Sequence, residues 1–240
     1  MSERREARLV PAWVLHSYPY RETSLIVEAL SRDHGRIGLV ARGARRNARG
    51  SLRPAPFAPL LLSFRQHGEL ATLSGCEADG APYRFGGDAF LAACYLNELL
   101  LRLLPRDDPA PEVYAIYTEA LAALAPVPAP AVRRFEGRLL RILGWAPPWG
   151  RDASGAVLDS ARRYRYDPRR GPVPVAREEE GFGADMFEAI AAERFEEPEV
   201  LAAAAKIFRE IIAYHLGGKR LKTLEVARSL SRGNERSSAA

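Results

Sequence analysis

Cysteine and lysine are scarce in this chain of 240 residues, and each scarcity limits the kinds of structure and charge that the chain can have. The two cysteines, Cys76 and Cys94, stand in apolar runs, which excludes a disulfide scaffold and predicts a reducing, cytoplasmic location. Lysine occurs only three times against 32 arginines. Guanidinium groups therefore carry nearly all of the positive charge, and they bind phosphate through two parallel hydrogen bonds.

Long apolar runs are also missing from the chain. The longest, "AFLAACYLNELLLRLL", is interrupted by Asn97, Glu98 and Arg102 and is too short to span a bilayer. The first residues, "MSERREARLVPAW", have charge but lack the apolar centre of a secretion signal. We therefore expect a soluble protein of the cytoplasm with no membrane partner.

The motifs of common catalytic and metal sites are absent as well. The four histidines and two cysteines show none of the spacings of zinc sites, so we expect neither a metal nor another cofactor. Gly217–Lys219 resembles the end of a nucleotide-binding loop, but it follows a helical pattern and continues with Arg220 instead of Ser or Thr. Acidic clusters at 107–108, 178–180 and 196–197 lie in loops or at helix starts, unlike those of a two-metal nuclease. We predict that the chain is not an enzyme.

One stretch of 18 residues, "RIGLVARGARRNARGSLR", contains six arginines and no acidic residue. The six are Arg36, Arg42, Arg45, Arg46, Arg49 and Arg53. Residues 1–80 hold 12 arginines against eight acidic residues, so the excess charge is concentrated near the amino end. Because like charges destabilise a compact fold, such a stretch is either merely solvated or binds a polyanion. We predict that it binds the phosphates of a nucleic acid.

The first 80 residues have the pattern of β-structure. Runs rich in Val, Leu, Ile, Phe and Thr alternate with turn sequences such as "RDHG" and "RQHG". The runs cover residues 9–17, 24–31, 36–42, 58–65 and 69–77. Five short strands with one long loop predict a small closed barrel. The two-residue period places Arg36 and Arg42 on its outer face, and Tyr18 and Tyr20 are candidates for stacking on bases.

From about residue 86 the apolar period becomes helical. Helices are predicted within 87–105, 107–126, 130–144, 183–192 and 198–216, followed by a last short helix. The stretch at 146–181 is rich in Pro and Gly and is predicted to be an irregular insert with one hairpin. The fold class is α+β, with a barrel domain over residues 1–80 and a mostly helical domain over residues 81–240 that contains the insert.

A second basic group is the stretch "GGKRLKT". The double glycine is predicted to end the preceding helix and to let the backbone turn sharply. Lys219, Arg220 and Lys222 follow it. Two explanations stay open for these three cations: contact with DNA, or interaction with the negative end of the helix dipole.

A third basic group lies in the helix "PAVRRFEGRLLRILG". The spacing of Arg134, Arg138 and Arg141 places them on one stripe of this helix. With Tyr114 and Leu121 supplying an apolar groove, such cations would receive a short peptide that is both acidic and hydrophobic. The alternative is that the stripe is an ordinary solvated helix face.

Five stretches together resemble the RecO family of bacterial recombination mediators. In chain order they are "VLHSYPYRETSLIVEALSRDHGRIGLVARGARR", "PFAPLLLSFRQHGELATLSGCEA", "YLNELLLRLLPRDDP", "VRRFEGRLLRILGW" and "YHLGGKRLKT". The resemblance implies an N-terminal OB-fold and a C-terminal helical domain. It also implies a nucleoid-associated repair factor that binds single- and double-stranded DNA and anneals complementary strands. Such a factor displaces single-stranded-DNA-binding protein so that RecA can load, usually together with RecR.

The resemblance also assigns roles to particular residues. It makes the six arginines of the OB-fold and the "GGKxLK" segment the DNA-binding residues. The family's "LRRFE" helix, whose first arginine helps to receive the acidic tail of single-stranded-DNA-binding protein, falls on Val132–Glu136, which favours Arg133 over the stripe. Several members bind zinc through four cysteines in the insert, but this chain has no cysteine after Cys94. Here the insert must be loose, or it is held by aromatic residues: Trp145, Trp149, Tyr164 and Tyr166.

Three alternatives remain beside this hypothesis of a DNA repair mediator. The first is an RNA-binding OB-fold module without a repair role, because the composition of the chain does not distinguish RNA from DNA as the ligand. The second is an enzyme, either a nuclease or a nucleotidyl transferase. The third is a scaffold whose arginines are only solvated.

Overall fold

The computed structural model describes residues 9–45, 53–66, 68, 70–176 and 181–227. The chain divides into two compact units, one formed by residues 1–122 with 223–240 and the other by residues 123–222. Over the residues that the structure describes, no helix is both long and apolar enough to cross a membrane.

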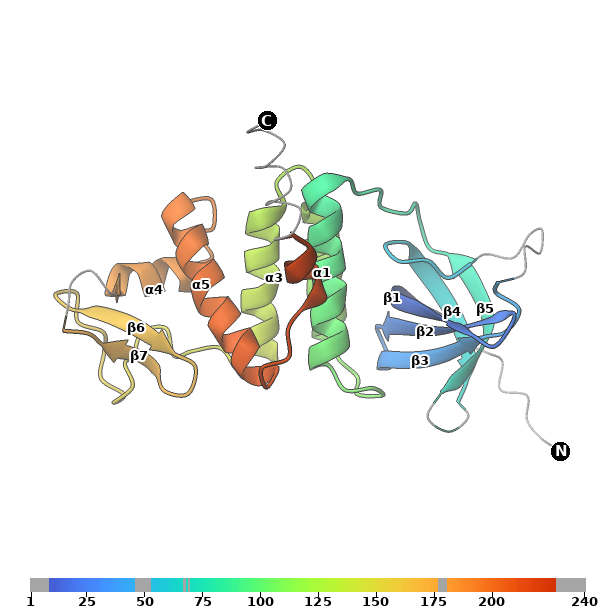
Figure 1. Cartoon of the computed structure of the whole chain (residues 1–240), viewed down its shortest axis with the longest axis horizontal. Coiled ribbons are helices and arrows are strands. Elements are labelled where there is room, and N and C mark those ends of the chain that lie inside the picture. The colour runs from blue at the N-terminus through green and yellow to red at the C-terminus, as the bar shows by residue number, and fades with distance from the viewer. Residues whose placement is uncertain (1–8, 46–52, 67, 69, 177–180, 228–240) are drawn as a thin grey trace. The chain divides into compact units, whose positions relative to one another are not determined.

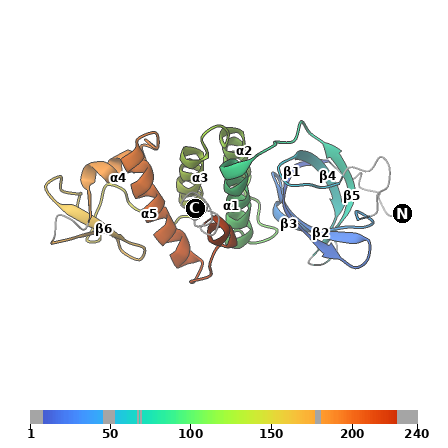
Figure 2. The same cartoon turned by 45° about the horizontal axis from the view of Figure 1, so that its top comes forward.

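The first unit contains a closed five-stranded barrel (Figures 1 and 2). Its strands are β1 (Val10–Tyr20), β2 (Ser24–Ser31), β3 (Gly35–Ala41), β4 (Pro59–Arg65) and β5 (Ala71–Ala78). They close in the order β1-β2-β3-β5-β4, with β3 and β5 parallel and the other neighbours antiparallel. This is a five-stranded Greek-key barrel, so the predicted OB-fold is confirmed.

The barrel interior is filled by alternate residues of the strands. Val27, Leu39 and Ala71 belong to paired positions on β2, β3 and β5 and are all buried. Side chains at directly paired positions point to the same face of a sheet, so these three define the inner face. Burial of such β-branched and aliphatic side chains is the main stabilising contribution to a small barrel.

Helices α1 (Gly87–Leu103) and α2 (Pro111–Ala123) pack in the same compact unit as the barrel. Residues 222–227 are also helical, which confirms the last short helix predicted from the sequence. The Trp13 indole N–H of β1 donates to the Thr118 hydroxyl of α2 over 2.9 Å. Asn97 of α1 donates to the Leu15 carbonyl over 2.8 Å and accepts from the Tyr117 hydroxyl over 2.5 Å. Burial raises the pKa of Tyr117, which keeps this hydroxyl protonated as a donor. The predicted boundary at residue 80 marks the change from strands to helices, whereas this compact unit continues to residue 122.

The second unit contains three helices and a small sheet, coloured from yellow-green to orange in Figure 1. The helices are α3 (Pro128–Ile142), α4 (Ala184–Ala191) and α5 (Pro198–His215). The sheet has the order β7-β6-β8, from β6 (Arg163–Asp167), β7 (Gly171–Pro174) and β8 (Phe182–Gly183). The β6–β7 pair confirms the hairpin predicted in the insert, and β8 is a third strand that the sequence pattern did not indicate.

Aromatic contacts hold the start of the insert against α5. The ring of Trp145 stacks on that of His215, with centroids 3.8 Å apart and planes 6° apart. Trp149 meets Phe208 edge to face at 6.0 Å. Desolvation lowers the pKa of His215, so its neutral form faces Trp145 at neutral pH.

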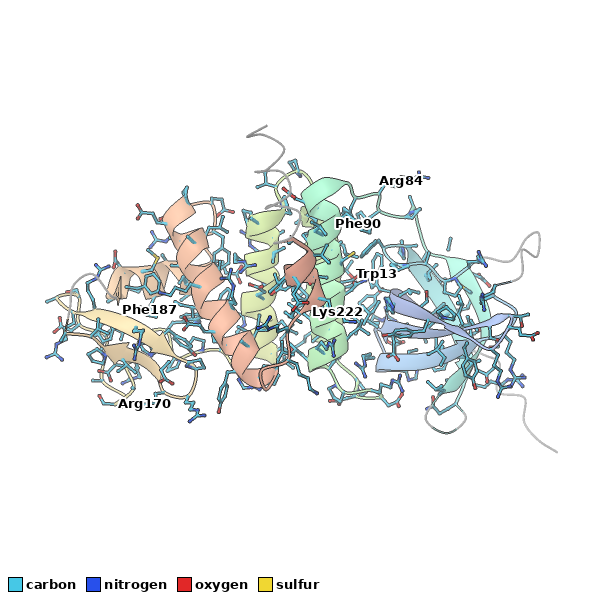
Figure 3. All side chains as sticks on the ribbon, in the orientation of Figure 1. Trp13, Arg84, Phe90, Arg170, Phe187 and Lys222 are labelled. Atoms are coloured by element: carbon cyan, nitrogen blue, oxygen red, sulfur yellow. The ribbon has the colours of Figure 1, made fainter. Side chains whose placement is uncertain are left out.

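Aromatic residues also hold the hairpin itself. Tyr164 is fully buried and meets Phe187 of α4 edge to face at 6.4 Å (Figure 3 labels Phe187 where α4 meets the sheet). The Tyr164 hydroxyl accepts the backbone N–H of Asp159 over 2.8 Å. Burial raises the pKa of Tyr166 to about 12. The described part of the insert is therefore packed, as the aromatic alternative predicted.

These contacts lead to a prediction about metal. No cysteine follows Cys94, and the residues that the structure describes contain no cluster of His, Cys, Asp or Glu able to hold a metal ion, so the insert does not fit a four-cysteine zinc site. We expect dialysis against a chelator to leave the melting temperature unchanged, since aromatic packing holds the insert. Calorimetry before and after dialysis measures this, and a drop of several degrees would contradict it.

Candidate nucleic-acid interface

Arg36, predicted to lie on the free outer face of the barrel, is instead occupied by internal contacts. Its guanidinium donates to the Leu101 carbonyl, and its Nε lies 3.7 Å from a Glu28 carboxylate oxygen. Arg106 also binds Glu28 through two nitrogens, one of them over 3.3 Å. The Arg36 side chain is only 17% exposed. Its charge is paired with Glu28 and its side chain is largely covered, so these contacts do not favour Arg36 as a DNA contact, and its assignment stays a prediction.

The cover over Arg36 depends on Gly38. Gly38 is the direct partner of Glu28 on the neighbouring strand, and a Cβ there would lie 3.0 Å from the Arg106 guanidinium carbon. The missing side chain lets Arg106 cross the sheet to reach Glu28. The outer face of the barrel is thus covered at this end and offers no cation to a ligand from Arg36.

We expect Arg36→Ala to reduce stability without changing the electrostatics of DNA binding. Loss of a hydrogen bond from a charged donor lowers the free energy of unfolding by about 1–3 kcal/mol. The slope of log affinity against log salt should be unchanged, since no phosphate contact is lost. Urea denaturation and fluorescence anisotropy at several salt concentrations measure the two effects. A flatter slope would return Arg36 to the interface.

The arginines beyond β3 differ from Arg36. Arg42, Arg45 and Arg53 are exposed, and none of them forms an ion pair with a described carboxylate. Arg45 donates from its backbone N–H to the Thr23 carbonyl over 2.9 Å and from its guanidinium to the Arg21 carbonyl over 3.1 Å. Arg53 donates to the Ala44 carbonyl over 2.7 Å. The backbone contacts position these cations, and no described carboxylate compensates their charge.

The two remaining arginines of the predicted face, Arg46 and Arg49, lie outside the described residues. Arg42, Arg45 and Arg53 are called the arginine cluster below. A cluster of uncompensated guanidinium groups on a strand end and its loop can bind successive phosphates of a polynucleotide.

The basic segment after α5 has the predicted geometry. Gly217 and Gly218 both adopt left-handed backbone conformations, with φ of 59° and 79°, and end the helix. The Gly217 N–H donates to the Tyr214 carbonyl over 3.1 Å. Lys219, Arg220 and Lys222 are exposed, and between them Leu221 is buried. Both explanations for this segment, DNA contact and dipole interaction, stay open.

The arginines of α3 are paired with carboxylates of their own unit. Arg133 lies 2.9 Å from the buried Glu136 carboxylate, so the residue favoured by the resemblance carries a compensated charge. Arg134 lies 2.9 Å from Glu196, and this hydrogen bond, after a backbone one, lowers the pKa of the Glu196 carboxyl. The acidic pair at 196–197, which the sequence indicated as a solvated cluster, thus includes a partner of the α3 stripe.

Glu193 is a further partner that the sequence did not indicate. Arg138 donates to both of its oxygens over 2.9 Å, and Arg134 lies 3.3 Å from it. The Glu193 carboxylate is separated from α3 by more than 50 positions in the sequence. The signal that could have indicated this pairing was the negative charge of the stretch before α5, which complements the arginines of α3. Two α3 arginines are therefore held by acids of the same unit.

The other two residues of the predicted peptide groove are in the first unit. Tyr114 is half-buried and Leu121 is fully buried, so the Leu121 side chain offers no surface to a ligand. Arg133 and Arg134 belong to the second unit. The groove stays a prediction.

Comparison with known proteins agrees with this architecture. The model of the family "Recombination protein O N terminal" matches residues 8–80, and that of "Recombination protein O C terminal" matches residues 84–225. A protein of Methylococcus capsulatus named DNA repair protein RecO is 40% identical over 224 residues, which cover 92% of this chain and 93% of that protein. Proteins of the same name from Xanthomonas oryzae and Stenotrophomonas maltophilia are 42% and 43% identical over more than 90% of each chain. The chain belongs to the RecO family of DNA repair proteins.

Proposed function

We propose that the chain is a non-enzymatic recombination mediator that binds single- and double-stranded DNA and anneals complementary strands. The observation that carries the proposal is the arginine cluster, whose charges have no described carboxylate partner, on a barrel of OB topology in a RecO family member. Two DNA strands repel each other through their phosphates. A protein that neutralises both backbones at once lowers this repulsion and lets base pairing proceed.

The proposal includes protein partners. The chain acts with RecR and helps to load RecA onto DNA that is coated by single-stranded-DNA-binding protein, whose acidic tail is received by the helical part. Arg133 and Arg134 are the residues proposed for that tail. Since each is paired with a carboxylate, the tail must replace Glu136, Glu193 or Glu196 as the partner of a guanidinium group.

Annealing of coated strands tests the proposal. Complementary oligonucleotides are covered with single-stranded-DNA-binding protein, either intact or without its acidic tail, and duplex formation is followed by fluorescence transfer. We expect acceleration with the intact protein and a loss of acceleration without the tail. Equal acceleration in both cases would remove the tail from the proposal, and no acceleration in either would reject annealing.

RNA binding without a repair role is the second candidate. An OB-fold with a cluster of arginines does not by itself select deoxyribose. Competition between DNA and RNA oligonucleotides of one sequence separates the two functions, and a preference for RNA would favour this candidate.

A further inference from the structure

The outer face of the barrel is covered at one end and open at the other. At the covered end, Trp13 is hydrogen-bonded to α2 and Leu30, its paired residue on β2, is buried. At the open end, Tyr18 is 46% exposed and is paired with Ile26, which in turn is paired with Val40 of β3. Directly paired residues share a face, so these three side chains form one apolar row on the outside of the barrel.

A β-bulge separates the two ends along β1. The register with β2 shifts between Val14 and His16, and from His16 onwards β1 turns exposed. Bulges re-aim the side chains that follow them. The His16 ring meets the Tyr18 ring edge to face at 4.4 Å, which restricts the orientation of Tyr18. An exposed aromatic side chain is thus held in place on this part of the outer face.

The arginine cluster lies beside this row. Arg42 is the first residue after β3, two positions beyond Val40, and is exposed. Arg45 is bonded to the carbonyls of Arg21 and Thr23, in the turn that joins β1 to β2. The cations Arg42 and Arg45 therefore lie near the end of the apolar row, and the cations and the row belong to the same barrel.

We propose that the row of Tyr18, Ile26 and Val40, the base platform, receives unpaired bases of a single DNA strand while the arginine cluster holds its phosphates. The inference rests on the proposed function, since it uses the same arginines. Base faces are exposed only in single strands, whereas a duplex presents phosphates and groove edges. Stacking of one base on an aromatic side chain strengthens binding by about tenfold. This face of the barrel therefore prefers single strands to duplexes.

An abasic oligonucleotide separates stacking from phosphate contact. It has the backbone charge of an oligothymidine of equal length but no bases. We expect the full chain to bind the oligothymidine about tenfold more tightly than the abasic strand. Tyr18→Ala should abolish this difference and leave both the affinity for the abasic strand and the salt slope unchanged. Tyr18→Phe should keep the difference, since the ring remains.

Tyr83→Ala is the matched control. Tyr83 is 36% exposed, belongs to the same unit and packs on Trp13 at the covered end. Its replacement should leave the preference for bases intact. An undiminished preference of Tyr18→Ala for the oligothymidine over the abasic strand would overturn the base platform. An equal loss of affinity for both strands would also overturn it. So would a protein partner whose binding depends on Tyr18 while DNA binding does not. The proposed function would survive these results, because it is tested separately by strand annealing and by the effect of the arginine cluster on DNA binding. RNA of equal length, bound more tightly than DNA through Tyr18, would also overturn the assignment to DNA.

Discussion

Reversal of two charges in the arginine cluster, Arg42→Glu with Arg45→Glu, should weaken binding of single-stranded DNA by at least about a hundredfold. A hydrogen bond to a charged partner contributes about 1.5–3 kcal/mol, and each 1.4 kcal/mol is about a factor of ten in affinity. Reversal adds repulsion to the loss of both contacts. Neither arginine has a described carboxylate to which its charge is committed, so the fold should tolerate the change. Fluorescence anisotropy and strand annealing both report it.

The control makes the same change of net charge elsewhere. Arg162 and Arg194 are exposed and lie 3.5 Å from Asp159 and Glu197, respectively, in the second unit. The variant Arg162→Glu with Arg194→Glu should lose far less affinity, since it removes no proposed phosphate contact. Equal losses in the two double variants would mean that only net charge matters, and the assignment of the cluster would be wrong.

The largest effect on stability is expected for Gly35→Ala. Gly35 is the first residue of β3, directly after the turn from β2. It has a φ of +68° and approaches the loop after α1 so closely that a Cβ would lie 1.7 Å from the Asp108 carbonyl oxygen. The left-handed backbone costs an alanine about 1–2 kcal/mol, and the clash with backbone adds about 1–3 kcal/mol or more. We expect the free energy of unfolding to fall by at least about 3 kcal/mol in urea denaturation.

Gly43 provides a matched control for this substitution. Its φ is +70°, nearly that of Gly35, but a Cβ there would meet nothing within 4 Å. Gly43→Ala should therefore lose only the backbone contribution of about 1–2 kcal/mol. The difference between the two variants measures the close approach of the barrel to the segment at Asp108. Equal losses would show that this approach contributes nothing.

The barrel could be predicted from the sequence because its information is local. A two-residue period, interrupted by turns with glycine, places five strands, and a closed sheet is the simplest way to bury five such strands. The confirmed strand β2 and the predicted run at 24–31 have the same limits. The helices were predictable for the same reason. The third strand of the small sheet was not, because β8 has only two residues and shows no period.

The occupied arginines could not be predicted, because their partners are distant in the chain. Glu28 and Arg106 are separated by 78 positions, and period-2 geometry alone says which face Arg36 occupies, not what covers that face. Likewise, Arg138 and Glu193 are separated by 55 positions. Local charge patterns locate cations, but only the tertiary structure distinguishes cations that are paired with a carboxylate from those that no described carboxylate pairs.

The salt dependence of single-stranded DNA binding tests the central claim most directly. Each phosphate contact contributes about 0.7 to the steepness of log affinity against log salt on single strands, so about five contacts give a slope near −3.5. Arg42→Ala with Arg45→Ala should flatten this slope by about 1.4. Parallel lines for the wild-type chain and this variant would contradict the claim that the arginine cluster neutralises DNA phosphates.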